Sequence, residues 1–493
     1  MNIRHLMLRG AKWTVLYKML DRTLGVISTI VLAHLLMPAD FGIVAMATAL
    51  LTLLQLLAYF GLDVALIREQ ETTPADYNCA WTLNLLFGIL IAILMLALAI
   101  PASHFYRNPH VAAVIAWLSL AAVLQGLENV GVVMFRKEMR FDRDFKYMFS
   151  KRAIRFSVTL LFALSLRTYW ALLIGILVGR ASGVVLSYVL QPFRPRFTLR
   201  GIGKLMQFSK WLMLHNAMSF MRSRSSDFII GRLAGAGSLG IFSIASEISD
   251  LPGTELVGPI NRAVMPAYMK LSQDLPALCR EYLSVLSLVA LIAVPAVAGT
   301  ALCAPSLVLL LLGQKWAPAA GLIEILAFYG MTRVIQSNSY AAYLALGKPQ
   351  YFVGMTSIYV SILIGLLIVL TGLYGLHGAA WAYVIASGIG LPLDFYFVTR
   401  FMGVHPNAYV SSLWRPLCST ALMYLAVRSL GPALPSVTVL SAAHAAYALV
   451  LYILIGAPTY VLADIFLWTL SGRPADAAEA IMLRRARNLA LHR

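Results

Sequence analysis

Long apolar stretches separated by short polar segments extend along almost the whole chain. Each stretch is close to, or longer than, the roughly 20 residues that an α-helix needs to cross a bilayer. The pattern therefore predicts fourteen membrane-spanning helices and an all-α polytopic membrane protein. The predicted spans are 13–36, 41–67, 80–101, 111–134, 148–166, 169–190, 206–232, 238–261, 282–303, 317–345, 352–372, 376–399, 409–428 and 437–464.

Basic residues fall mainly in alternate gaps between these spans. If the N-terminus is cytoplasmic, 28 of the 39 Lys and Arg lie in cytoplasmic segments and 5 lie in periplasmic loops. Cytoplasmic loops of membrane proteins carry such an excess of positive charge. We therefore expect a multi-pass protein of the bacterial inner membrane with both termini in the cytoplasm.

The composition agrees with this interpretation and limits the possible chemistry. Hydrophobic residues make up 60% of the chain and charged residues 12%, and fourteen spans leave no length for a soluble catalytic domain. The net charge of +18 fits membrane orientation and anionic lipid head groups, so we expect membrane lipids and no nucleic acid as partners. The sequence holds neither HExxH nor a phosphate-binding P-loop pattern. We expect no enzyme activity, metal or cofactor, and transport that depends on H⁺ or Na⁺ coupling or on substrate supply and removal.

Similar strings recur 198 residues apart. Lys12-Trp13 and Lys210-Trp211 each open an apolar stretch, and Gly42-Ile43 matches Gly240-Ile241 at the same offset. Chance similarity between apolar stretches is the alternative to a duplication. A duplication predicts two parallel, pseudo-symmetric lobes of six helices with the substrate near the membrane midplane between them. The predicted domains are the N-lobe 1–193 (helices 1–6), the C-lobe 194–403 (helices 7–12), helices 13 and 14 at 404–470, and a basic cytoplasmic tail at 471–493.

Several motifs occur in order along the first twelve spans. They are GAKW (10–13), ADFGI (39–43), FGLDVALIREQE (60–71), RKEMRF (136–141), INRAVMPAY (260–268), LLGQKWAPA (311–319) and ALGKPQY (345–351). The chain thus resembles the polysaccharide, or lipid-linked oligosaccharide, branch of the multidrug/oligosaccharidyl-lipid/polysaccharide flippase superfamily, and most of all its colanic-acid and exopolysaccharide type. This resemblance implies a transporter that moves undecaprenyl-pyrophosphate-linked repeat units from the cytoplasmic to the periplasmic leaflet. It implies a place in exopolysaccharide, O-antigen or capsule biosynthesis, with a polysaccharide polymerase and chain-length proteins as further partners.

The six basic residues that are not counted with the cytoplasmic segments or periplasmic loops lie inside predicted spans, where an ionisable side chain needs a partner or a water-filled cavity. A pyrophosphate head group needs cationic donors, and guanidinium offers a planar fork for phosphate oxygens. The candidates for a pyrophosphate site are Lys18, Arg22, Arg180, Arg222, Arg224 and Arg333. The alternative is that these cations neutralise carboxylates of the bundle, as Asp21 could do for Lys18. Asp227 could do the same for the two arginines of the seventh span.

The sugar part of such a substrate needs neutral hydrogen-bonding groups and aromatic faces. The candidates are Gln125, Asn129, Asn216, Gln336, Asn338, Tyr340 and Tyr343, with ordinary helix packing as the alternative for each. Carboxylates at the membrane midplane carry coupling ions in pumps. The candidates for H⁺ or Na⁺ coupling are Glu128, Glu247 and Asp250.

Two other functions compete with a flippase that works by alternating access. A multidrug exporter of the same fold commonly takes cationic substrates, so an acidic cavity would be expected in place of Arg and Lys in the first and seventh spans. A membrane-embedded glycosyltransferase or polymerase generally needs a sizeable extramembrane loop or an acidic metal-binding motif. The predicted loops are too short for this, so the sequence favours the flippase.

Overall fold

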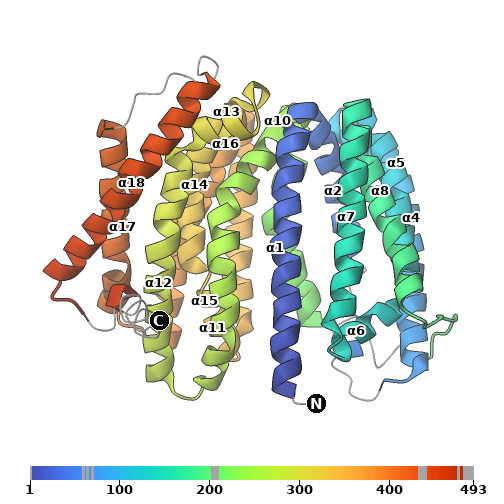
Figure 1. Cartoon of the computed structure of the whole chain (residues 1–493), viewed down its shortest axis with the longest axis horizontal. Helices are drawn as coiled ribbons and strands as arrows, with labels where there is room; N and C mark the ends of the chain where they lie inside the picture. The colour runs from blue at the N-terminus through green and yellow to red at the C-terminus, as the bar shows by residue number, and fades with distance from the viewer. Residues whose placement is uncertain are drawn as a thin grey trace. The chain divides into compact units, whose positions relative to one another are not determined.

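A computed structural model describes residues 3–57, 62, 66, 67, 72–200, 210–430, 441–474 and 478–480. Every regular element in these ranges is a helix (Figure 1), which confirms the predicted all-α fold. In chain order the elements are α1 (Ile3–Leu35), α2 (Pro38–Leu57), α4 (Pro74–Tyr106), α5 (His110–Leu127), η1 (Val130–Val132), α6 (Val133–Lys137), α7 (Phe141–Leu166), α8 (Tyr169–Leu190), α10 (Lys210–Pro252), η2 (Gly253–Val257), α11 (Gly258–Lys270), α12 (Leu275–Leu302), α13 (Ala304–Leu311), η3 (Gln314–Trp316), α14 (Pro318–Gln336), α15 (Ser339–Ala345), α16 (Pro349–Met402), α17 (Pro406–Leu430) and α18 (Ala442–Leu470).

Nine helical segments among the described residues are long and apolar enough to cross a membrane. Two of them are pairs of helices, because α10 is interrupted at Gly235 and α16 at Gly375, each with a positive φ that glycine adopts easily. Helices α1, α7 and α17 also have the length of a span, with 33, 26 and 25 residues. The chain is therefore a polytopic membrane protein.

The last long helix shows how these elements suit a bilayer. On α18, the side chains of Leu454, Leu462 and Phe466 are exposed, whereas Asp464 is buried. The hydroxyl of Ser419 on α17 donates to Asp464 (Oγ to Oδ1, 3.4 Å). Apolar side chains on the outside match the acyl chains of lipid, and polar groups on the inside find partners on neighbouring helices.

The chain divides into two compact units, Met1–Gly240 and Ile241–Arg493. In the first unit α1 packs against α7, α7 against α8, and α5 against α2, α4 and α8. In the second unit α12 packs against α14 and α17, α14 against α16, and α17 against α18. Tyr268, Tyr282 and Tyr343 are fully buried in the main core of the second unit.

Within the first unit, two glycines fit closely against each other's helix. A Cβ atom on Gly42 of α2 would lie 1.8 Å from the carbonyl oxygen of Ala236, and one on Gly240 would lie 1.9 Å from that of Pro38. Pro38 and Ala236 are 198 residues apart, and so are Gly42 and Gly240. Residues matched by the predicted repeat therefore make the same contact in both directions, and only glycine permits so close an approach of two backbones.

The short segment 478–480 packs against the second unit through a buried ion pair. Arg415 of α17 and Glu479 are 7% and 6% exposed, and their Nε and Oε1 atoms are 2.8 Å apart. A second contact joins Nη2 to Oε2 at 3.5 Å, and the neighbouring Ala478 is fully buried. Arg415 lies inside the predicted span 409–428, and the sequence gave no sign of this attachment.

The glycine contact gives the first prediction. Gly42→Ala and Gly240→Ala should each lower the apparent free energy of unfolding by roughly 1–3 kcal/mol, because the new methyl group forces two backbones apart. Gly237→Ala is the matched control, since a Cβ there meets nothing within 4 Å. Thermal unfolding of the purified protein in detergent measures all three. Equal stability of Gly240→Ala and Gly237→Ala would contradict the contact.

The attachment of the segment 478–480 gives the second prediction. Glu479→Ala leaves the Arg415 guanidinium buried without its carboxylate, which costs about 3–5 kcal/mol and should release the segment. In a background without the native cysteines, a cysteine at Ala478 should then react with a maleimide roughly 100-fold faster. Glu281→Ala, which removes an exposed glutamate of α12, is the control and should leave the rate unchanged. An unchanged rate in Glu479→Ala would show that the pair does not hold the segment.

Candidate functional site

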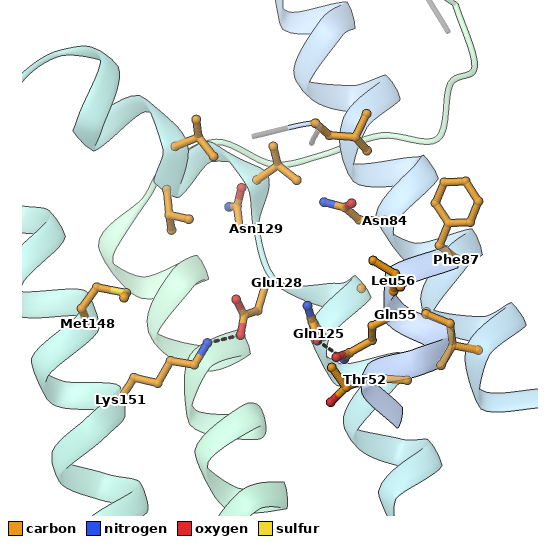
Figure 2. Close-up of a pocket in the computed structure, with 18 of the residues that line it drawn as sticks. Thr52, Gln55, Leu56, Asn84, Phe87, Gln125, Glu128, Asn129, Met148 and Lys151 are labelled. Carbon is orange, nitrogen blue, oxygen red and sulfur yellow. Dashed lines mark hydrogen bonds and ion pairs between the residues drawn. The ribbon is translucent and has the colours of Figure 1, made fainter. Parts of the chain in front are cut away.

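A cavity of about 840 Å³ lies within the first unit, between α2, α4, α5, α7 and α10 and beside the short helices η1 and α6 (Figure 2). It is lined by Thr52, Gln55, Leu56, Leu62, Asn84, Phe87, Gly88, Ile91, Ala122, Gln125, Gly126, Glu128, Asn129, Val130, Val132, Val133, Arg136, Tyr147, Met148, Lys151, Ser219, Phe220, Ser223 and Arg224. Its walls therefore combine charged groups, carboxamides and hydroxyls with apolar side chains.

The end of α5 shapes one wall of the cavity. The helix stops at Leu127, and Glu128 turns the chain out of the helix with a ψ of 137°. Asn129 fixes the following turn, because its Oδ1 accepts from the N–H of Gly131 (2.9 Å) and its Nδ2 donates to the carbonyl of Phe193 (2.6 Å). This break in the helix holds the Glu128 carboxylate at the cavity.

Close packing of α4 on α5 shapes the opposite wall. A Cβ atom on Gly88 would lie 2.6 Å from the carbonyl oxygen of Ala122, and one on Gly126 equally close to that of Asn84. Small residues allow two membrane helices to approach in this way. The approach brings the Asn84 and Gln125 side chains to the same side of the cavity (Figure 2).

The central charged group of the cavity is an ion pair between α7 and the end of α5. Lys151 donates from Nζ to Oε1 of Glu128 (Figure 2). The hydroxyl of Tyr147 donates to Oε2 (3.1 Å). Tyr147 and Lys151 are one turn apart on α7 and share a face. Both carboxylate oxygens of Glu128 are therefore occupied by donors from one helix.

The other two cations at the cavity also have acidic partners. Arg224 Nη1 lies 3.0 Å from Oδ2 of Asp227 one turn further along α10, and the carboxylate is buried while the guanidinium is largely accessible. Arg136 Nε lies 3.5 Å from Oδ1 of Asp144. The cavity therefore holds three cations and remains close to neutral.

Neutral hydrogen-bonding groups gather beside these charges. Gln55 of α2 donates from Nε2 to Oε1 of Gln125 (2.7 Å) (Figure 2). Asn84, Ser219 and Ser223 line the same cavity. Carboxamides and hydroxyls each both donate and accept hydrogen bonds, so this set suits a ligand rich in hydroxyl groups.

The six predicted pyrophosphate residues are dispersed. Of the described residues that line the cavity, Arg224 is the only one of the six. Arg333 forms an ion pair with Asp250 in the second unit (Nη1 to Oδ2, 2.5 Å). The others lie on α1, α8 and α10, where Lys18 is exposed and Arg22, Arg180 and Arg222 are half-buried.

Asp21 forms an ion pair with a different cation from Lys18, the partner that the sequence suggested. Its Oδ1 lies 2.8 Å from Nε of Arg152 on α7, and among the described residues Lys18 has no ion pair with it. The predicted neutralisation of a cation by a carboxylate therefore occurs, but between helices and with a different cation.

The predicted sugar-binding groups also separate into two kinds. Gln125 and Asn129 line the cavity, and Asn129 also donates to the carbonyl of Phe193. Asn338 lies in the second unit, where it accepts from the Tyr268 hydroxyl at 2.9 Å. Gln336 is in the second unit, and its Nε2 has no hydrogen-bond partner among the described residues. Tyr340 packs on Phe352 with ring centroids 4.7 Å apart. The side chain of Asn216 lies outside the described residues.

Two of the three predicted coupling carboxylates have cationic partners. Glu128 pairs with Lys151 and Asp250 pairs with Arg333, while Glu247 is exposed. Each pair thus joins a residue predicted for ion coupling to a basic residue.

The sequence interpretation missed several groups of this cavity, in particular Lys151, Arg136, Gln55 and Asn84. Lys151 carried a signal, because it lies inside the predicted span 148–166, but it was counted with the cytoplasmic charges of the segment before it. The two carboxamides carried none, since nothing in an isolated helix shows which of its polar residues will face a cavity.

Comparison with known proteins decides the family. The family model described as "Polysaccharide biosynthesis protein" matches residues 31–321, which is more than half of the chain. The chain belongs to this family. The lipopolysaccharide biosynthesis protein WzxC of Escherichia coli (strain K12) is 23% identical over 84% of this chain and 86% of its own length. The teichuronic acid biosynthesis protein TuaB of Bacillus subtilis (strain 168) is 22% identical over 86% and 88%. The succinoglycan biosynthesis transport protein ExoT of Rhizobium meliloti (strain 1021) is 24% identical over 65% of each chain.

Solved structures share the fold. The lipid II flippase MurJ, in an inward closed conformation, matches with a TM-score of 0.73 at 13% identity, over 93% of this chain and 99% of its own. A multidrug resistance MATE family transporter of the MOP superfamily, in an inward-facing conformation, matches with a TM-score of 0.60 at 13% identity, over 77% and 94%. The predicted resemblance to the flippase superfamily is confirmed. The solved proteins that share this fold are a lipid flippase and a multidrug transporter, which agrees with the expectation of no enzyme activity.

The ion pair at the cavity gives the third prediction. Lys151→Met leaves the Glu128 carboxylate without its cation, and Glu128→Gln leaves the ammonium without its anion, so each single change should destabilise the protein. The double variant should lose less unfolding free energy than the two single variants together. The difference, which is the coupling energy of the pair, should be roughly 0.5–3 kcal/mol. Thermal unfolding in detergent measures the stability of the wild type, the two single variants and the double variant. Additive losses of stability would show that the two side chains do not interact.

Proposed function

We propose that this protein is a lipid-linked oligosaccharide flippase that moves undecaprenyl-pyrophosphate-linked repeat units from the cytoplasmic to the periplasmic leaflet by alternating access. The observation that carries the proposal is the cavity of the first unit, in which three cations and a group of carboxamides and hydroxyls share one space. A diphosphate joined to a sugar is a ligand that needs both kinds of group.

The cations keep unused donors although each has an acidic partner. The Lys151 ammonium has three N–H groups and gives one to Glu128, and the guanidinium of Arg224 has five and gives one of its nitrogens to Asp227. A phosphate group can accept hydrogen bonds from the unused donors, and it can compete with the carboxylates for the donors that they already occupy. Binding of the head group is then an exchange of anions at a fixed cation, while the polyprenyl chain stays in the bilayer.

The architecture supports alternating access. Nine candidate spans, two of which are pairs of helices, and three further long helices support the proposed fourteen crossings. The reciprocal contact at Gly42 and Gly240 supports a duplicated arrangement, with six-helix lobes at 1–193 and 194–403 followed by two more helices at 404–470. In this arrangement Lys18, Arg22, Arg180, Arg222 and Arg333 remain candidates for contacts with the head group at other stages of the cycle.

The cellular setting is part of the same proposal. The distribution of basic residues supports an inner-membrane protein with both termini in the cytoplasm. The names of the relatives WzxC, TuaB and ExoT refer to three different bacterial polysaccharides. This supports a role in exopolysaccharide, O-antigen or capsule biosynthesis, beside a polysaccharide polymerase and chain-length proteins. The cations of the cavity disfavour the alternative of a multidrug exporter for cationic compounds.

Binding of inorganic pyrophosphate to the purified protein in detergent tests the site. Lys151→Gln and Arg224→Gln should each weaken binding roughly tenfold or more, because each removes a charge-assisted hydrogen bond. Glu128→Gln should strengthen binding, because it removes the anion that competes for Lys151. Lys146→Gln, which removes an exposed cation of the same helix outside the cavity lining, is the matched control.

Isothermal titration calorimetry gives the dissociation constants of all four variants. Unchanged affinity in both Lys151→Gln and Arg224→Gln would remove the cavity from the proposal. Weaker binding in Glu128→Gln would show that this residue supports the site and does not compete with the ligand.

A further inference from the structure

The second unit contains a buried acid that the proposed site does not use. Asp394 lies in the second half of α16 and is 1% exposed. Its Oδ2 accepts a hydrogen bond from the hydroxyl of Ser339, the first residue of α15, at 2.8 Å. The surrounding helices α11, α12, α15 and α17 supply the main hydrophobic core of the unit.

Hydroxyl groups connect this carboxyl to its neighbours. The Oγ of Ser339 is 3.0 Å from the hydroxyl of Tyr282 on α12, and either can donate. Tyr343 of α15 is fully buried, interacts electrostatically with Asp394, and its hydroxyl has no hydrogen-bond partner among the described residues. Tyr409 of α17 also interacts electrostatically with Asp394. Among the described residues, the titratable groups that interact with Asp394 are thus the tyrosines Tyr282, Tyr343 and Tyr409.

Buried hydrogen bonds of Asn338 link the backbone at Tyr282 to Tyr268. Asn338 donates from Nδ2 to the carbonyl oxygen of Tyr282 (3.2 Å) and accepts from the hydroxyl of Tyr268 on α11 (2.9 Å). Asn338 and Tyr268 are both fully buried. The Tyr282 and Ser339 hydroxyls form a buried chain of hydrogen bonds that ends at the Asp394 carboxylate.

Asp394, like Asp464 of α18, is a buried carboxyl that accepts a hydrogen bond from a serine hydroxyl and forms no ion pair among the described residues. Asp227, Asp250 and Glu479 each form an ion pair with an arginine, whereas no described Lys, Arg or His forms one with Asp394. An ionised carboxylate buried without a counter-charge is strongly unfavourable, and protonation removes the charge. A bound metal ion is less suited to neutralise this charge, because among the described residues no group of three His, Cys, Asp or Glu surrounds the site.

We propose that Asp394 is a proton-binding site, and that it takes up and releases one proton in each transport cycle. In the uptake step a proton from water forms an O–H bond with a carboxylate oxygen of Asp394, beside the Ser339 hydroxyl. In the release step that bond breaks and the proton returns to water. The coupling to transport rests on the proposed function, whereas proton binding does not. The site is distinct from Glu128, Glu247 and Asp250, the coupling residues that the sequence suggested.

Infrared spectroscopy of the full-length protein in lipid films, followed through a pH titration, tests proton binding without a substrate. The wild type should show the carbonyl band of a protonated carboxylic acid that disappears at alkaline pH. Asp394→Asn should lose this band, and Asp274→Asn should keep it, because Asp274 is an exposed residue that caps α12. A titrating band of unchanged intensity in Asp394→Asn, or a band that does not respond to pH, would overturn the proposal.

A second variant serves if Asp394→Asn does not fold. Ser339→Ala removes the hydrogen bond that the carboxylate accepts among the described residues and leaves the acid in place. The ionised form loses its donor, so the carbonyl band should persist to a pH higher by roughly one to two units. An unshifted titration in Ser339→Ala would show that the observed band does not belong to Asp394.

Transport in vesicles under an imposed pH gradient tests the coupling. The gradient should change the rate of flipping of lipid-linked oligosaccharide by the wild type and by Asp274→Asn, and should not change it in Asp394→Asn. A gradient response that survives in Asp394→Asn would overturn the coupling. A wild type that flips no such lipid would instead contradict the proposed function, and the infrared titration would still decide whether Asp394 binds a proton.

Discussion

The bilayer gives a buried charge neither water nor mobile counter-ions, so every charge inside the helical bundle needs a partner supplied by the protein. The pairs Lys151 with Glu128, Arg224 with Asp227 and Arg333 with Asp250 meet this need. Such pairs add little stability of their own, because both groups must first lose water. Their value is in placing cations at defined positions inside a membrane protein.

This constraint also shapes the proposed mechanism. A cavity whose cations are already neutralised does not hold stray anions tightly, and an anionic head group enters by taking the place of a carboxylate. The displaced carboxylate of Glu128 would then need another donor, which Tyr147 can continue to supply. Asp394 satisfies the same constraint differently, since it has hydroxyl groups and no cation around it. A group of that kind can become neutral only by gaining a proton.

The sequence could predict the helices because the span signal is local, but it could not predict most of the contacts that build the site. Asp21 lies three residues after Lys18, yet it pairs with Arg152 of another helix. Gln55 and Gln125 are 70 residues apart and meet because α2 packs on α5. Arg224 was recognised, together with its partner Asp227, because both lie on one helix. The match between Gly42 and Gly240 was visible as a repeat, whereas the contact that joins these segments required the structure.

The account depends most on the movement of a lipid-linked oligosaccharide across the membrane. The direct measurement uses the purified protein in sealed vesicles that contain a fluorescent undecaprenyl-pyrophosphate-linked oligosaccharide in both leaflets, with a membrane-impermeant quencher added outside. Without the protein only the outer-leaflet half of the lipid should be quenched. With the wild type, quenching should proceed to nearly all of the lipid, and with Lys151→Gln it should proceed much more slowly. Quenching that stops at one half, with wild-type protein that is folded and inserted in the vesicles, would contradict the claim that this protein is a flippase.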